Sequence, residues 1–265
     1  MFKEQKFNDC IYMESDLLSS KHIFSTRSGG VSSGVWDSWN FGENRGDEIE
    51  NVRENYRRAG EIFGVSGDDF VVTRQVHGIE VRLASESDRH VIGESVPYEI
   101  DGLVTNVKGL PILIHIADCV PVLMEDAEAG VIAAVHCGWK SSVADILGAA
   151  VEKMLTLGAK AENIRAAIGA SIGFCCFETE AEVPEAVEKY LGGDTDGLIK
   201  DDGNGKFHVD LRGANARRLL QLGLKPENLD VSCECTMCSQ EKYWSHRGTK
   251  GVRGSMCAAI MLERE

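Results

Sequence analysis

The segment from Leu110 to Lys140 most constrains how this 265-residue chain can fold, because it predicts a buried hairpin. Two apolar runs, Leu110–Met124 and Val131–His136, flank a polar segment, 125–130, that ends in glycine. Such a pattern is typical of two strands joined by a turn. We expect the functional site in this hairpin, because it carries Cys119 and His136.

The register of the predicted hairpin brings two reactive side chains together. If Met124 faces Val131 across the turn, counting back along both strands places Cys119 opposite His136. Directly opposed residues on one face have Cβ atoms about 5 Å apart, close enough for a thiolate and an imidazole to share a metal or a proton. The alternative is a core cysteine beside a core histidine, since free cysteine is among the most buried residue types.

The composition is that of a globular protein and excludes several functional classes. Hydrophobic residues make up 43% of the chain, and no apolar run reaches the length of about 18 residues that a membrane helix needs. The N-terminus lacks the basic start and apolar stretch of a signal peptide, so we expect a cytoplasmic protein.

A net charge of −14 argues against general affinity for nucleic acid or anionic membranes, although a local cationic pocket can still bind a small anion. Nine cysteines, an odd number, favour reduced thiols over a disulfide framework.

Strands mixed with helices, rather than alternating strictly with them, predict an α+β fold of largely antiparallel sheets flanked by helices. No linker, repeat or low-complexity segment interrupts the sequence, so we expect a single domain over residues 1–265. Segment Phe70–Leu83 predicts strand, tight turn and strand, with His77 at the turn. Apolar periodicity predicts helices over 47–63, from Ser142 to about 157, over 180–190 and over 212–222. Ser142 and Asp145 have the spacing of a capping box, with Asp in place of the usual Glu or Gln.

His77, Cys119 and His136 form the strongest chemical constellation in the sequence. Two imidazoles and one thiolate suit zinc, and three protein ligands leave the fourth position open, as in catalytic zinc sites. Their separations of 42 and 17 residues match no zinc-finger spacing. Asp118, beside the cysteine, is a candidate catalytic residue that could orient a histidine or accept a proton, and a structural role is the alternative.

Further cysteines and cations have weaker assignments. Cys233, Cys235 and Cys238 could hold a structural metal, although a fourth ligand is missing, whereas the adjacent Cys175 and Cys176 are expected to pack because they cannot both face one site in extended backbone. The predicted helix start after Lys140 offers free N–H groups to an anion. The basic residues that could meet such an anion, or else lie solvated at the surface, are Arg27, Arg74, Lys140, Arg247 and Arg253.

Six short motifs together resemble one family, the YfiH-like family, also called the laccase-domain or multicopper polyphenol oxidase family. They are RQVHG (74–78), DGLVT (101–105), ADCVPVLM (117–124), HCGWK (136–140), GASIGFCCFE (169–178) and YWSHRG (243–248). The resemblance implies a fold related to that of the cytotoxic necrotizing factor toxins, with zinc bound by His77, Cys119 and His136. It also implies phosphorolysis of adenosine, guanosine, inosine and methylthioadenosine, and deamination of adenosine. The implied partners are purine nucleosides and phosphate. The helix start after Lys140 offers a cradle for the phosphate that Arg74 and Arg247 could close, so these three are the candidate phosphate-binding residues.

The sequence departs from the family pattern in places that leave the metal ligands intact. Cys137 replaces the usual Ala, Lys140 and Ser141 stand where Arg-Gly is commoner, Ala170 and Phe174 replace prolines, and Gly248 replaces a second Arg after SHR. These changes affect the expected phosphate contacts, and so the balance of phosphorolysis and deamination.

Three other interpretations differ in class. A laccase with several coppers needs more histidines, commonly in His-x-His pairs, than the seven here, which include no such pair; copper is therefore less favoured than zinc. A metal-free hydrolase or amidase of cell-wall peptides would use Cys119 as nucleophile and His136 as base. The third is a non-catalytic binding module. The sequence leaves the oligomeric state, the preferred nucleoside and the general acid open.

Overall fold

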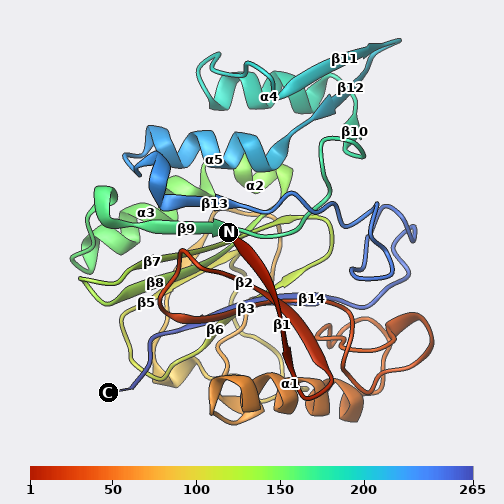
Figure 1. Cartoon of the computed structure of the whole chain (residues 1–265), viewed down its shortest axis with the longest axis vertical. Coiled ribbons are helices and arrows are strands. Elements are labelled where there is room, and N and C mark those ends of the chain that lie inside the picture. Colours follow the sequence, from red (N-terminus) through yellow and green to blue (C-terminus); the bar gives the residue numbers. More distant parts are fainter. Residues whose placement is uncertain (265) are drawn as a thin grey trace.

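Two large β-sheets face each other at the centre of the protein, and helices cover their outer surfaces (Figure 1). The structure, a computed structural model, describes residues 1–264. It is an α+β fold whose sheets are largely antiparallel, which confirms the predicted class. No helix within this part of the chain has both the length and the apolar character needed to cross a membrane.

The first large sheet has five antiparallel strands. Their order is β1 (Phe2–Phe7), β2 (Cys10–Ser15), β3 (Lys21–Ser25), β14 (Met256–Met261) and β6 (Ile112–Ile116). The C-terminal strand β14 therefore lies in the middle of a sheet that is otherwise built from the first half of the chain. Its outer face packs against helix α1 (Ile49–Phe63), the helix predicted over 47–63, and Gly64 ends that helix with a φ of +75°.

The second large sheet has six strands and holds the predicted hairpin at its centre. Its order is β13 (Leu229–Val231), β9 (Arg165–Ile168), β7 (Val120–Asp126), β8 (Val131–Cys137), β5 (Gly102–Thr105) and β4 (Val81–Leu83). Every residue of β7 and β8 is buried, because the strands are covered on both faces. One face packs on the five-stranded sheet, and the other packs on helices α3 (Ile146–Thr156), α4 (Glu182–Tyr190) and α5 (Leu211–Gln221).

A small third sheet lies beyond these helices, at the top of the molecule in Figure 1. It has the order β10 (Glu178–Thr179), β12 (Lys206–Val209) and β11 (Ile199–Gly203). Strand β10 directly follows the loop 169–177, which carries Cys175 and Cys176, and the small sheet fixes one end of that loop.

The helix predicted to start at Ser142 is two helices. A short α2 (Trp139–Val143) comes first, and α3 begins after Asp145, whose side chain accepts a hydrogen bond from the N–H of Gly148. Asp145 has a φ of +73°, which breaks the helix and makes this residue the N-cap. The predicted capping box is therefore wrong, while the apolar stripe of α3 faces the core as expected.

The predicted strand before His77 is also absent. Residues 70–75 run extended and make two isolated bridges, Val71 with Ile112 and Arg74 with Glu99, whereas a regular strand begins at Val81. The segment is tied to β6 through Gln75, whose side chain accepts from the N–H of His115 and donates to its carbonyl oxygen.

The long loop 26–48, which precedes α1, is held in place by one buried amide. Asn55 of α1 donates to Ser32 Oγ and to the carbonyl oxygen of Asn40, and accepts from the N–H of Val31. Asn40 in turn accepts from the N–H of Ser255, just before β14. These bonds fix the end of the loop near the site described next.

Candidate active site

The chain reaches the candidate site where it passes from one large sheet to the other. Strand β6 ends at Ile116 in the five-stranded sheet, and β7 begins at Val120 in the six-stranded sheet. Asp118, between them, has a φ of +77°, which turns the chain sharply. The apolar run 110–124 is therefore two strands in different sheets, not the single strand predicted. Cys119 sits at the crossing, immediately before β7.

The hairpin has a register shifted by two residues from the predicted one. Strand β7 pairs Pro121, not Cys119, with His136, and Asp126 with Val131. The strand runs on past Met124 because the two acidic residues after it are bonded rather than solvated. Glu125 accepts from the N–H groups of 19 and 20, and Asp126 accepts from those of 128 and 129.

A shift of two residues preserves the face on which each side chain projects. Cys119 and His136 therefore still meet, and His77 joins them from the turn before β4. The ligand atoms of the three residues all lie within 4.8 Å of one another. Cys119 Sγ lies 3.7 Å from His77 Nε2, and the two imidazole rings lie 5.0 Å apart at an angle of 77°. The structure thus brings together all three predicted metal ligands.

Asp101, at the start of β5, orients both histidines. This fully buried carboxylate bonds His136 Nδ1 at 2.8 Å and accepts three consecutive backbone N–H groups, those of Val76, His77 and Gly78. His77 has a φ of +61°, an unfavourable conformation for this residue type that these bonds stabilise. Because Asp101 engages Nδ1 of His136, the Nε2 atom is left free to bind a metal.

The electrostatics of the triad favour a thiolate. Burial alone would raise the pKa of the Cys119 thiol, but the charge and hydrogen bond of His136 lower it from 9.0 to about 6. Burial opposes protonation of His136, yet the neighbouring thiolate and Asp101 raise the pKa of its imidazole to about 9. Burial would also raise the pKa of Asp101, and the hydrogen bond from His136 lowers it below its ordinary value. A thiolate facing an imidazolium is therefore the stable pair without a metal.

The Asp118 carboxylate bonds residues outside the triad and ties the crossing to a segment near the C-terminus. Its carboxylate accepts from Thr236 Oγ1 at 2.6 Å, from Ser245 Oγ at 3.0 Å and from the backbone N–H of Arg247 at 2.7 Å. None of these partners is a histidine, so the carboxylate that orients the histidines is Asp101. Asp118 instead fixes the segment 236–247 against the crossing.

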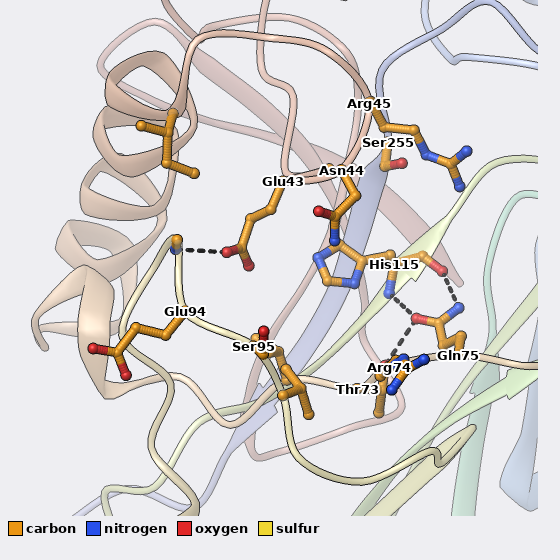
Figure 2. Close-up of a pocket in the computed structure, with 15 residues that line it drawn as sticks. Glu43, Asn44, Arg45, Thr73, Arg74, Gln75, Glu94, Ser95, His115 and Ser255 are labelled. Atoms are coloured by element: carbon orange, nitrogen blue, oxygen red, sulfur yellow. Dashed lines mark hydrogen bonds between the residues drawn. The ribbon is translucent and has the colours of Figure 1, made fainter.

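A cavity of about 320 Å³ opens over the triad. Its walls come from the crossing, from the 169–178 loop through Ile172 and Phe177, and from the segments before β14. A second, wider cavity of about 710 Å³ adjoins it, and the two share the residues Arg45, Gln75, His115 and Ser255. Figure 2 shows this wider cavity, with Arg45 and Ser255 on the side of His115 opposite Glu94. Each of the two volumes is in the range of small-molecule sites.

Cationic side chains line the triad cavity. Arg253 is 8% exposed, and its Nη1 donates to the carbonyl oxygen of Gly254 and to Ser255 Oγ, but its Nε has no partner among the described residues. Burial and the nearby charge of Arg45 lower the pKa of the Arg253 guanidinium from 12.5 to about 10. Neither arginine forms an ion pair with a carboxylate within residues 1–264. The pair is a cationic pocket of the kind that an acidic protein needs to bind an anion.

The three predicted phosphate residues lie in different places. Arg247 lines the triad cavity, with its guanidinium over the ring of Phe177. Arg74 lines the wider cavity and pairs with Glu99 at 3.2 Å. Lys140 lies exposed on α2, its ammonium 5.6 Å from the centre of the Trp139 ring, and borders neither cavity.

Arg45, Asp101 and His246 are site residues to which the sequence analysis gave no role. His246 lines the triad cavity, and its Nδ1 lies 3.4 Å from Arg253 Nη2. Burial and the charge of Arg253 lower the pKa of this imidazole, so it is neutral near pH 7. Local sequence offered little signal for Arg45, since it comes from the long loop. Asp101 belongs to the DGLVT motif, but its hydrogen-bond partners lie 23 to 35 residues away in the sequence, so local pattern does not reveal its role.

The prediction that Cys175 and Cys176 merely pack is wrong. They lie in a turn rather than in extended backbone, and both sulfurs face Cys238. Cys235 completes the group, whereas Cys233 is exposed and lies outside it.

Comparison with known proteins gives a consistent assignment. Residues 21–263 match the family described as multi-copper polyphenol oxidoreductase laccase. A purine nucleoside phosphorylase of Deinococcus radiodurans is 37% identical over 247 residues, covering 93% of this chain and 91% of that protein. The adenosine deaminase RL5 of an unknown prokaryotic organism is 34% identical over 228 residues, covering 84% and 87%. The crystal structure of the Bacillus licheniformis hypothetical protein YfiH superposes with a TM-score of 0.91 at 26% identity, covering 99% of both chains.

Proposed function

The chain belongs to the multi-copper polyphenol oxidoreductase laccase family, also called YfiH-like, and from this premise we propose that it is a zinc-dependent enzyme of purine nucleosides. The proposed reactions are phosphorolysis of adenosine, guanosine, inosine and methylthioadenosine, and hydrolytic deamination of adenosine. The names of the relatives, purine nucleoside phosphorylase and adenosine deaminase, support both halves. The proposed location is the cytoplasm, where nine unpaired cysteines stay reduced.

The donor atoms of the triad fit zinc. Two imidazole nitrogens and one thiolate sulfur lie close enough to converge on one ion, and the thiolate is favoured even without a metal. Zinc bound here would act as a Lewis acid and lower the pKa of water at its open position. We propose that His77 binds through Nε2, His136 through Nε2 and Cys119 through Sγ.

Several coppers fit this chain poorly, because the other histidines have different partners. His22 bonds Ser15 and Ser20, His90 bonds Glu43, His115 bonds Tyr56, His208 bonds Asp202, and His246 lies against the Arg253 guanidinium. Such engaged and scattered imidazoles do not converge on further metal ions. The proposed metal is therefore one zinc ion at this site.

The cationic pocket supplies the proposed phosphate site. Phosphorolysis requires phosphate to reach C1′ of the ribose while the purine departs from it. Within residues 1–264, the Nε–H of Arg253 has no partner, and Arg45 and Arg247 line the same cavity without a carboxylate partner for their guanidinium groups. Charge-assisted bonds from guanidinium groups to phosphate are short and strong, so we assign phosphate to these three arginines.

His246 is the proposed hydrogen-bond donor to the leaving group. Its imidazole lines the triad cavity, and with Nδ1 facing the Arg253 guanidinium, the Nε2 atom is the one that carries the proton. A neutral imidazole can donate this N–H in a hydrogen bond to a leaving purine or amine, and so stabilise the charge that develops there near pH 7. Asp118 remains a less favoured candidate, because its oxygens already accept three hydrogen bonds.

The observation that carries the proposal is the convergence of His77, Cys119 and His136 in a cavity that is also lined by the buried Arg253, whose Nε has no partner within residues 1–264. Its test uses zinc-loaded protein in two assays: inosine with phosphate, measuring ribose 1-phosphate, and adenosine without phosphate, measuring ammonia. We expect product in both, and loss of both in Cys119→Ala. Absence of product from all four nucleosides and from adenosine deamination would exclude the proposal.

A metal-free cysteine hydrolase of cell-wall peptides is the second candidate, because the thiolate–imidazolium pair of Cys119 and His136 is also that of a cysteine nucleophile and its base. Zinc removal separates the two. A hydrolase of this kind keeps its activity after complete chelation and forms an acyl adduct at Cys119, whereas the zinc enzyme loses activity and regains it with zinc.

A further inference from the structure

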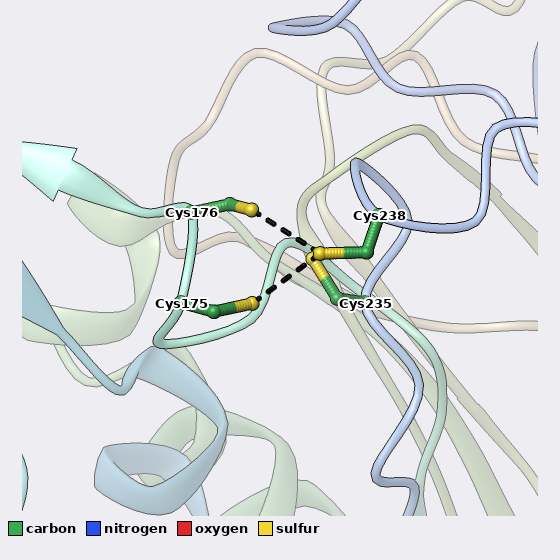
Figure 3. A group of neighbouring side chains, drawn as sticks. All are labelled: Cys175, Cys176, Cys235 and Cys238. Carbon is green, nitrogen blue, oxygen red and sulfur yellow. Dashed lines mark hydrogen bonds between the residues drawn. The ribbon is translucent and has the colours of Figure 1, made fainter.

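A second cluster of metal-ligand type includes two cysteines of the 169–178 loop, the loop whose Ile172 and Phe177 line the triad cavity. The sulfurs of Cys175, Cys176, Cys235 and Cys238 all lie within 4.8 Å of one another. Figure 3 shows Cys175 and Cys176 on one loop, pointing toward Cys235 and Cys238 on another. Two chain segments about sixty residues apart thus contribute two thiols each to one point.

The two sulfur–sulfur distances from Cys238 are close to those expected for four thiolates around a single ion. With zinc–sulfur bonds of about 2.3 Å, the sulfurs of a four-cysteine site lie about 3.8 Å apart. Here Cys238 Sγ lies 3.4 Å from that of Cys176 and 3.6 Å from that of Cys175. An iron–sulfur cluster places several atoms between its thiolates and requires wider spacing.

The backbone around the cluster is shaped for close approach of the sulfurs. The N–H of Gly173 donates to Cys235 Sγ at 3.2 Å, and the turn 173–177 is closed by hydrogen bonds from Cys176 and Phe177 to the carbonyl oxygen of Gly173. A Cβ at position 173 would meet Cys235 Cβ at 3.1 Å and Cys175 Sγ at 3.4 Å. The turn lets two adjacent cysteines face one point, which extended backbone forbids.

We propose that these four cysteines bind a second zinc ion, with a structural role. Four thiolates and no open position are the donor set of structural rather than catalytic zinc. The ion would join the 169–178 loop to the segment 235–247. This proposal is independent of the proposed function, since no ligand of the first site takes part.

The cluster stands behind one wall of the triad cavity. Arg247 donates to the carbonyl oxygens of Cys176 and Glu178, and its guanidinium lies 5.3 Å from the centre of the Phe177 ring. Arg247 and Phe177 both line the cavity. A zinc ion that fixes Cys176 and Cys238 would therefore hold this wall in position.

Metal counting tests the proposal, with Cys233→Ser as the matched control because that exposed thiol lies in the same motif but outside the cluster. Protein purified in the presence of zinc is analysed by native mass spectrometry. We expect two zinc ions in the wild type and in Cys233→Ser, and one each in Cys238→Ser and Cys119→Ser. A Cys238→Ser protein with the same zinc content as Cys233→Ser would overturn the proposal, and so would a wild type whose entire zinc content is lost in Cys119→Ser.

Cobalt substitution tests whether the four cysteines bind a metal ion even if Cys238→Ser fails to fold. In Cys119→Ser, where the first site is disabled, one equivalent of cobalt should give the thiolate charge-transfer absorption of four sulfurs, and a chelator should abolish it. Absence of this band overturns the proposal. Fewer than nine titratable thiols in unfolded, unreduced and metal-free wild type, with peptide mapping that places the disulfide among these four cysteines, would also overturn the proposal.

Discussion

Asp101 Oδ1 lies 2.8 Å from His136 Nδ1 and also accepts the backbone N–H of His77 at 3.0 Å, so one carboxylate positions two of the three candidate metal ligands. The two histidines come from different parts of the chain, a turn and a strand, and this carboxylate contacts the ring of His136 and the backbone of His77. The buried aspartate therefore links the metal affinity of the site to the stability of the fold.

Asp101→Asn should lower zinc affinity about 10- to 100-fold, the effect typical of removing the partner of a metal-bound histidine. The new amide NH₂ would face the N–H groups of Val76 and Gly78. All three of these groups are hydrogen-bond donors, so the two backbone N–H groups would lose their acceptor. Competition with a chelating dye measures the affinity, and urea unfolding of the metal-free protein measures stability.

Asp126→Asn is the matched control for that substitution. Asp126 is equally buried and accepts three backbone N–H groups, from residues 128, 129 and 160, but lies at the opposite end of β7 from the triad. Both variants should lose stability, and Asp101→Asn alone should lose zinc affinity. Similar zinc affinity in the two would show that Asp101 does not orient the ligands.

Gly138→Ala should weaken zinc binding about tenfold or more by displacing His77. A Cβ at this position would lie 2.6 Å from His77 Cδ2, too close for the ring to stay in place. Gly78→Ala is the comparison, because its Cβ would make ordinary contacts at 3.6 and 3.7 Å. Equal zinc affinities in the two variants, by the same dye competition, would contradict this geometry.

Much of the fold follows from local pattern, and the errors have physical causes. Periodicity located α1, α3, α4 and α5, because amphipathic helices record their buried face in the sequence. It did not show that the run 110–124 crosses between two sheets, since both strands are buried and the turn consists of a few residues. Asp118 takes its left-handed conformation there without a glycine to mark it.

The site was predicted in part, because a register error of two residues leaves each side chain on the same face of the sheet. The hairpin register was wrong by two residues, yet the alternation of faces still brought Cys119 and His136 together. Arg45, Arg253 and the four-cysteine cluster depend on contacts between distant segments. No spacing rule predicts that Cys176 meets Cys238, since the intervening residues form helices, strands and a separate sheet.

Metal-free protein should show an unusual pH dependence of alkylation at Cys119. Because the pKa of its thiol is lowered from 9.0 to about 6, the thiolate is already formed at pH 7, and the rate with iodoacetamide should stay level from pH 7 to 9 and fall below about pH 6. Peptide mass spectrometry resolves Cys119 from the other eight thiols. In urea-unfolded protein the rate should instead rise through about pH 8.5. An alkylation rate at Cys119 that still rises between pH 7 and 9 in folded protein would contradict the presence of a thiolate–imidazolium pair.

Arg253→Met should raise the KM for phosphate by about 10- to 150-fold, the equivalent of roughly 1.5 to 3 kcal/mol for a hydrogen bond to a charged group. The substitution keeps an apolar stem in a buried position and removes the guanidinium whose Nε has no partner within residues 1–264. Deamination of adenosine, which uses no phosphate, should change less.

Lys140→Ala is the comparison, because that ammonium is exposed and borders neither cavity. Phosphate dependence of inosine cleavage measures both variants: we expect the KM of Lys140→Ala to stay within about twofold of wild type, well below the loss of one such bond. A larger rise in Lys140→Ala than in Arg253→Met would move the phosphate to the start of α2, the place that the sequence alone suggested, and leave Arg253 with a structural role.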